Sequence, residues 1–159
     1  MTFFNRQRLT NDVFKIDVKR MRRGWYSDKY FENIGVMLRS LAEQGYLFKG
    51  DALSLSGVDL SNTEVGNLEV EMQWFTRRTG KVVVAGVDKA LTMLRHCSGY
   101  FNDDGKFINT WNRLEVEAVH DGANVTFEGD PASIQPVIRV RGRYRDFALL
   151  ETPTLGLLT

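Results

Sequence analysis

Apolar residues recur at helical spacing in two stretches of the chain. The first predicts a helix that Ser27 can cap and that Gly45 ends, with Asp28 near the positive end of the helix dipole. Its predicted apolar face consists of Tyr30, Ile34, Met37, Leu38 and Leu41. The second predicts a helix after Gly86, whose apolar stripe consists of Val87, Ala90, Leu91, Leu94 and Cys97. Each helix should therefore pack one face against a core.

Alternating residues before the second helix predict strands. In residues 68–74 apolar and polar side chains alternate, so one face should meet a core and the other water. Thr79 and Gly80 then form a turn, and the β-branched run at residues 82–84 predicts a buried strand. Residues 51–64 give a weaker signal, a short edge strand that leads into a loop.

A second group of alternating residues follows the second helix. Residues 114–118 and 125–127 flank Asp121 and Gly122, which tolerate a positive φ, and together they predict a β-hairpin. Residues 137–140 predict a last strand, which ends at Gly142.

The composition is that of an ordinary domain. The chain has 159 residues, and its net charge of +1 argues against a nucleic-acid binder with a wholly basic surface. Its single cysteine, Cys97, excludes an internal disulfide, which is typical of a cytoplasmic protein. No stretch has the ~20 apolar residues of a membrane span, and the first residues lack the apolar core of a signal peptide.

The last segment of the chain is strongly apolar. Phe147, Leu149, Leu150, Leu155, Leu157 and Leu158 fall within its last 13 residues. Free chain ends are usually polar, so we expect another part of a longer chain to cover this segment. The expected division is a first domain at residues 1–142 and the start of a larger domain at residues 143–159.

Five stretches of the sequence resemble one enzyme family. They are residues 14–17 with 24–31, residues 70–78, residues 83–91, residues 136–142 and residues 149–158. In this order they resemble the nicotinate phosphoribosyltransferases and, more distantly, the quinolinate phosphoribosyltransferases. The resemblance implies an α+β amino-terminal domain of mixed sheet and helices, followed by an irregular α/β barrel. Residues 143–159 would then be the helix that leads into the barrel.

The resemblance also implies a reaction. The family transfers phosphoribose from phosphoribosyl pyrophosphate to nicotinate, giving nicotinate mononucleotide, with Mg²⁺ and usually with ATP hydrolysis. Its active sites form in a homodimer, where one amino-terminal domain meets the partner's barrel. The resemblance implies neither a membrane nor a nucleic acid as a partner. A barrel needs roughly 200 residues more, so we expect this chain to contain no catalytic residue, to bind no cofactor and to be inactive alone.

The substrate-binding candidates lie at the start of the first predicted helix. The resemblance assigns Tyr30 to stacking on the pyridine ring, which suits an aromatic face. Asp28 could hold a hydrogen bond in the site, and Tyr26 is a weaker candidate. Each has a structural alternative: Tyr30 could pack in the core, Asp28 could serve the helix dipole, and Tyr26 could be a hydrophobic staple.

The phosphate-contacting candidates are arginines, whose planar forks suit phosphate oxygens. They are Arg22, Arg23, Arg77 and Arg78. The alternative for each pair is a solvated basic face. Cys97, His96 and His120 are too few and too far apart in sequence for a zinc pattern, so no metal site is predicted. The residues alone give no account of the four arginines at 139–145.

Two other functions remain open at the level of sequence. The substrate could be quinolinate rather than nicotinate, although the motif at residues 26–30 favours nicotinate. Alternatively, the chain could be a non-catalytic binding module derived from this domain.

Overall fold

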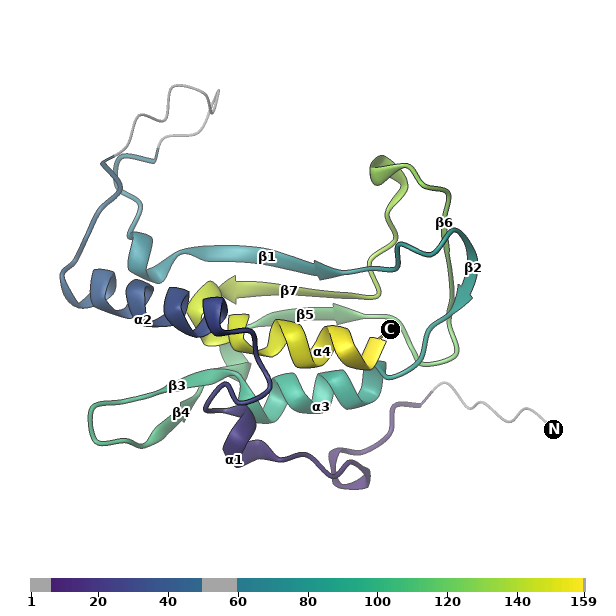
Figure 1. Cartoon of the computed structure of the whole chain (residues 1–159), viewed down its shortest axis with the longest axis horizontal. Coiled ribbons are helices and arrows are strands. Elements are labelled where there is room, and N and C mark those ends of the chain that lie inside the picture. Colours follow the sequence, from purple (N-terminus) through teal and green to yellow (C-terminus); the bar gives the residue numbers. More distant parts are fainter. Residues whose placement is uncertain (1–6, 50–59, 159) are drawn as a thin grey trace.

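The computed structural model describes residues 7–49 and 60–158 (Figure 1). The helices are α1 (Val18–Met21), α2 (Lys29–Glu43), α3 (Val87–Cys97) and α4 (Glu151–Leu158). The strands are β1 (Glu69–Trp74), β2 (Gly80–Val83), β3 (Gly99–Phe101), β4 (Phe107–Asn109), β5 (Glu115–Ala118), β6 (Asn124–Phe127) and β7 (Ile138–Arg143). Three single-turn 3₁₀ segments are needed below: η2 (Val65–Asn67), η5 (Tyr144–Asp146) and η6 (Ala148–Leu150).

The largest sheet is antiparallel and has β7 at its centre. Its strand order is β1-β7-β5, and Val140 of β7 lies between Met72 of β1 and Val116 of β5. The β2-β6 and β3-β4 pairs form two smaller antiparallel sheets. Helices α3 and α4 contact each other and run along the three-stranded sheet (Figure 1). The result is the α+β class that the sequence predicted.

The predicted hairpin between residues 114–118 and 125–127 is wrong. Both strands exist, but β5 pairs with β7 and β6 pairs with β2. The turn between them is present, with Gly122 at φ +84°. It directs the chain to a different sheet, because the carboxylate of Asp121 accepts hydrogen bonds from the N–H groups of Val87 and Asp88 (2.8 and 3.1 Å) at the start of α3.

The strand predicted to be buried at residues 82–84 is an edge strand. β2 pairs with β6 alone in the described chain, so Val83 remains 64% exposed while Val84 is buried. Of the weaker edge strand at residues 51–64, residues 51–59 lie outside the described ranges. The described remainder contributes a single bridge between Leu47 and Glu64.

Helix α2 has the predicted length but a rotated buried face. Phe31 and Leu38 are buried, whereas Tyr30 and Met37, both assigned to the buried face, are 53% and 54% exposed. The N-cap residue is Asp28 rather than Ser27. Gly45 follows the helix at φ +59°, and this confirms the predicted end.

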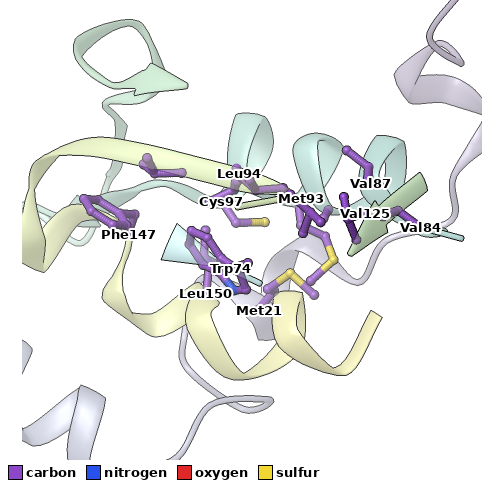
Figure 2. Packing of buried hydrophobic residues seen from close by; sticks show 14 residues of the cluster. Met21, Trp74, Val84, Val87, Met93, Leu94, Cys97, Val125, Phe147 and Leu150 are labelled. Atoms are coloured by element: carbon purple, nitrogen blue, oxygen red, sulfur yellow. The ribbon is translucent and has the colours of Figure 1, made fainter. Parts of the chain in front are cut away.

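The core forms where α3 meets the sheet and the last segment of the chain. The labelled residues of Figure 2 come from α1, β1, α3, β6, residues 147–150 and Val84, which follows β2. The predicted stripe of α3 is confirmed by Val87, Ala90 and Leu94 at 0% exposure. Burial raises the pKa of Cys97 to about 11, so this thiol stays protonated near neutral pH. The sequence pattern missed the β3-β4 hairpin and the short helix α1.

The apolar segment after β7 belongs to this same core. Phe147, Ala148 and Leu150 are 0–2% exposed, and Phe147 and Leu150 belong to the same cluster as residues of α3 and β7. The expectation that the whole segment needs cover from elsewhere is therefore wrong for residues 147–150. Leu155 of α4 is still 39% exposed. The division of the chain at residue 142 stays a prediction.

The arginines of β7 are explained by their neighbours in the sheet. On its polar face, Arg139 pairs with Glu71 (3.3 Å) and Glu117 (3.1 Å) on the two flanking strands. Arg141 pairs with Glu115 (2.6 Å) and also with Glu71. Cross-strand pairs of opposite charge stabilise a sheet, and the central strand supplies cations to carboxylates on both sides.

Candidate functional site

The start of α2 is joined to the start of α4 by a reciprocal contact. The N–H of Asp28 donates to the Thr152 hydroxyl oxygen, and that hydroxyl lies 3.3 Å from the Asp28 carboxylate. The Asp28 side chain makes no capping bond to its own helix. The dipole alternative therefore describes only part of its role, because Asp28 also links two helices that are more than a hundred residues apart in sequence.

Tyr30 lies beside this junction. Its ring is 4.0 Å from the Phe31 ring between centroids, and it is 53% exposed. Loss of solvent around the phenol, together with the carboxylates of Glu151 and Asp28, raises the pKa of Tyr30 above its ordinary value. The phenol is therefore neutral near pH 7. Core packing does not account for this residue, since about half of its surface faces solvent.

Tyr26 is held by the turn that precedes α2. Its hydroxyl donates to the carboxylate of Asp17 at 3.0 Å, and Asp17 also accepts from the backbone N–H of Arg20 as the N-cap of α1. The Arg20 N–H, then Tyr26 and the Arg20 guanidinium, lower the pKa of Asp17. Tyr26 is 45% exposed, and its hydroxyl bond fastens the α1-α2 connection.

The two arginine pairs lie in different places. Arg22 donates twice to the carbonyl of His96 (3.0 and 2.8 Å) near the end of α3, and its guanidinium lies 4.0 Å from the Phe107 ring. Arg23 is exposed and lies 6.0 Å from the Phe101 ring. A phosphate contact by Arg22 would compete with its hydrogen bonds to the His96 carbonyl. The Arg23 guanidinium makes no such hydrogen bond in the described chain.

Arg77 and Arg78 line an open groove of about 840 Å³. We call it the β1-α4 groove, because its walls come from β1, the β2 region and α4. Apolar residues form most of the lining: Phe31, Met72, Trp74, Phe75, Val82, Val83, Val84, Ala85, Val125, Val137, Leu155, Leu157 and Leu158. Its polar lining includes Glu151 together with the two arginines. The groove therefore combines an apolar wall with groups of both charges.

The structure brings together some of the predicted residues and separates others. Asp28 and Tyr30 meet Glu151 and Thr152, and Glu151 also lines the groove that Arg77 and Arg78 line. Arg22 and Arg23 contact the β3-β4 hairpin instead.

The sequence interpretation did not assign Tyr144, Glu151 or Thr152 to the site. Burial, then the neighbouring Tyr30 and Glu151, raise the pKa of Tyr144, so this tyrosine belongs to the same group of side chains. Glu151 and Thr152 fall within the fifth family-like stretch, residues 149–158, and that resemblance was the signal that could have assigned them to the site.

Within the described part of the chain, no three His, Cys, Asp or Glu side chains lie together as metal ligands. Among the described helices, none is both long enough and apolar enough to cross a membrane.

Comparison with known families decides the relationship. The family model described as "Quinolinate phosphoribosyl transferase, N-terminal domain" matches residues 58–159. The chain belongs to this family. The match confirms the predicted relation to the phosphoribosyltransferases, and it names quinolinate, which the sequence interpretation kept as the alternative to nicotinate. A search of curated proteins gave no match.

Two solved structures resemble the chain. The nicotinate-nucleotide pyrophosphorylase from Pyrococcus furiosus is 17% identical, with a TM-score of 0.48, over 91% of this chain and 27% of that one. The nicotinate-nucleotide pyrophosphorylase from Francisella tularensis is 14% identical, with a TM-score of 0.41, over 94% of this chain and 37% of that one. The chain thus spans about a third of the length of these proteins.

Proposed function

We propose that this chain is the amino-terminal domain of an enzyme that transfers phosphoribose from phosphoribosyl pyrophosphate to a pyridine carboxylate, in the synthesis of NAD. The family match over residues 58–159 is the observation that carries the proposal. The barrel that would complete the active site is supplied by the remainder of the enzyme, so the chain alone should form no product. In the functional dimer, each amino-terminal domain would face the barrel of the partner subunit.

Tyr30 is the residue of this domain best suited to hold the pyridine ring. Its exposed aromatic face can orient a flat ring, and it can favour the positive charge that develops on the ring nitrogen as the glycosidic bond forms. Asp28 supports the position of α2 through Thr152. Arg77 and Arg78 are the arginine pair better placed to reach a phosphate, because they line the open groove.

Mg²⁺ belongs to the proposed reaction but is not assigned to these residues. An all-protein magnesium site needs several oxygen ligands at one point, and the described residues offer no cluster of three candidate ligands. Mg²⁺, and ATP if nicotinate is the substrate, would bind elsewhere in the complete enzyme. What this domain supplies is an aromatic face, a hydrogen-bonded helix junction and two groove arginines.

The family match favours quinolinate as the acceptor, whereas the motif at residues 26–30 favours nicotinate. Both acids would give nicotinate mononucleotide and pyrophosphate, but quinolinate must also lose one carboxyl group as CO₂. The test supplies each acid with phosphoribosyl pyrophosphate to the enzyme that carries this domain and measures pyrophosphate and CO₂. Turnover with CO₂ release identifies quinolinate, and turnover without it identifies nicotinate. Turnover with neither acid contradicts the proposed function.

Replacing Tyr30 with alanine in that enzyme should lower kcat/KM for the pyridine carboxylate by about 10–100-fold, or ~1–3 kcal/mol, because the stacking surface is lost. Stability should change little, because the side chain is half exposed. The matched control is Met37→Ala, a residue equally exposed on the same helix, which should leave kcat/KM unchanged. A Tyr30→Ala enzyme with normal melting and normal steady-state constants would remove Tyr30 from the site.

A further inference from the structure

Two arginines, one at the end of β7 and one in η5, converge on one aromatic ring. Arg143 and Arg145 flank Tyr144 in sequence, and their guanidinium carbons lie 5.2 and 5.7 Å from the centre of the Tyr100 ring. Both also donate to the same side-chain oxygen of Asn67, at 3.2 and 3.0 Å. Two like charges are thus held close together by elements that are distant in sequence.

The positive charge of this group is only partly balanced. The carboxylate of Asp146, 4% exposed, accepts two hydrogen bonds from Arg143, both at 3.0 Å, and is fully engaged there. Glu64 accepts from the Asn67 amide, and this bond turns the amide oxygen toward the arginines. In residues 7–49 and 60–158, neither Arg145 nor Arg39 forms an ion pair with a carboxylate.

Arg145 carries the clearest sign of an unmet partner. Its Nε is buried and has no hydrogen-bond partner. Burial, then the like charge of Arg143, lower the pKa of the Arg145 guanidinium, and Arg39 of α2 adds to this while Asp146 opposes it. A buried donor without an acceptor costs free energy, and so do crowded like charges. An anion beside the Arg145 guanidinium would offset the crowding of like charges.

We propose that Arg39, Arg143 and Arg145 bind a phosphate group, either free or as a monoester. Guanidinium forks match phosphate oxygens, and α2, which carries Arg39, packs against η5, which carries Arg145. A phosphate monoester carries about −1.5 to −2 near pH 7, which fits the excess positive charge better than one carboxylate does. The pair of Asp146 and Arg143 illustrates that a single guanidinium suffices for a carboxylate.

This phosphate site is distinct from the arginine pair of the β1-α4 groove, although Tyr144, between Arg143 and Arg145, lies near Tyr30 and Glu151. Asn67 lies just before β1, whereas Arg77 and Arg78 follow its other end, so the two regions occupy opposite ends of that strand (Figure 1). The proposal therefore does not depend on the transferase function, and either can fail without the other.

The test titrates inorganic phosphate and, separately, ribose 5-phosphate into the protein at constant ionic strength, with binding followed by calorimetry and by the melting temperature. We expect saturable binding that Arg39→Ala weakens about 10-fold or more, because one charge-assisted contact is lost. Arg39 is exposed, so this variant should melt normally. Tighter binding of ribose 5-phosphate would indicate a monoester as the ligand, and equal binding would indicate free phosphate.

Two further variants keep the test decisive. Lys81→Ala removes an exposed cation of β2, in a different sheet from β7, and should leave the affinity unchanged. Arg145→Lys keeps the charge but removes the fork, and should weaken binding as Arg39→Ala does. Arg143 is left intact, because its loss would strand the buried Asp146. Non-saturable binding, or an affinity that neither Arg39→Ala nor Arg145→Lys changes, would overturn the proposal.

Discussion

Replacing Phe147 with alanine should lower the free energy of unfolding by about 3–5 kcal/mol, because a fully buried aromatic ring is lost and a cavity remains. Phe147 is 0% exposed, and its ring meets that of Tyr144 edge to face at 6.4 Å between centroids. The measurement is urea unfolding of the protein followed by tryptophan fluorescence. Trp74 lies in the same buried cluster and reports on it (Figure 2).

The control for this variant is Val36→Ala on α2. Val36 is 66% exposed, so its truncation should change the free energy of unfolding by less than about 0.5 kcal/mol. The same data test whether residues 143–158 unfold together with the rest of the chain. One transition that shifts as a whole is expected, whereas a separate transition for the last segment, or a loss below about 1 kcal/mol, would contradict the shared core.

The sequence predicted those elements whose pattern reflects a simple environment. The stripe of α3 and the strands β1 and β7 were found because each has one face in the core and one toward water. The same periodicity could not give strand partners, since β5 and β6 look like a hairpin until Asp121 is seen to bind the N–H groups at the start of α3. That contact joins residues more than 30 positions apart, and no local pattern encodes it.

The sequence also could not predict which face of α2 is buried, and this face decides the role of Tyr30 in the candidate site. Tyr30 and Phe31 are adjacent, so either could have faced the core, and the apolar spacing was compatible with Tyr30. The structure buries Phe31 and leaves Tyr30 half exposed, a difference set by packing against the rest of the domain. The choice between a core residue and a ring-stacking residue was thus not decidable from periodicity.

The arginines of residues 139–145 show which contacts could be predicted from the sequence and which could not. Arg139 and Arg141 alternate with apolar residues on β7, and Glu71, Glu115 and Glu117 alternate on its neighbours, so only the strand order was missing to predict their pairing. Arg143 lies opposite Glu69 of β1 but pairs with Asp146, and Arg145 lies beyond the end of the strand. Their convergence on Tyr100 depends on the β3-β4 hairpin, which the pattern did not predict.

Replacing Gly86 with alanine should destabilise the domain by about 2–6 kcal/mol. Gly86 has φ +90°, which costs an L-residue roughly 1–3 kcal/mol, and a Cβ there would lie 2.5 Å from the carbonyl oxygen of Leu157. Relieving that clash requires α3 and α4 to move apart, at a cost of roughly 1–3 kcal/mol more. Because Ala85 and Leu157 line the β1-α4 groove, the groove should widen as well. Thermal and urea unfolding measure the first effect.

Two glycines separate the causes of this loss. Gly122 has nearly the same φ, +84°, but no atom lies within 4 Å of the position that a Cβ would take, so Gly122→Ala should show the backbone strain alone. Gly35 lies in α2 with open space and an ordinary φ, and Gly35→Ala should raise stability by up to about 1 kcal/mol through helix propensity. The order of stability should be Gly35→Ala, then Gly122→Ala, then Gly86→Ala. If Gly86→Ala is no worse than Gly122→Ala, then α4 does not press on the start of α3, and the wall that it forms for the groove is looser than the structure describes.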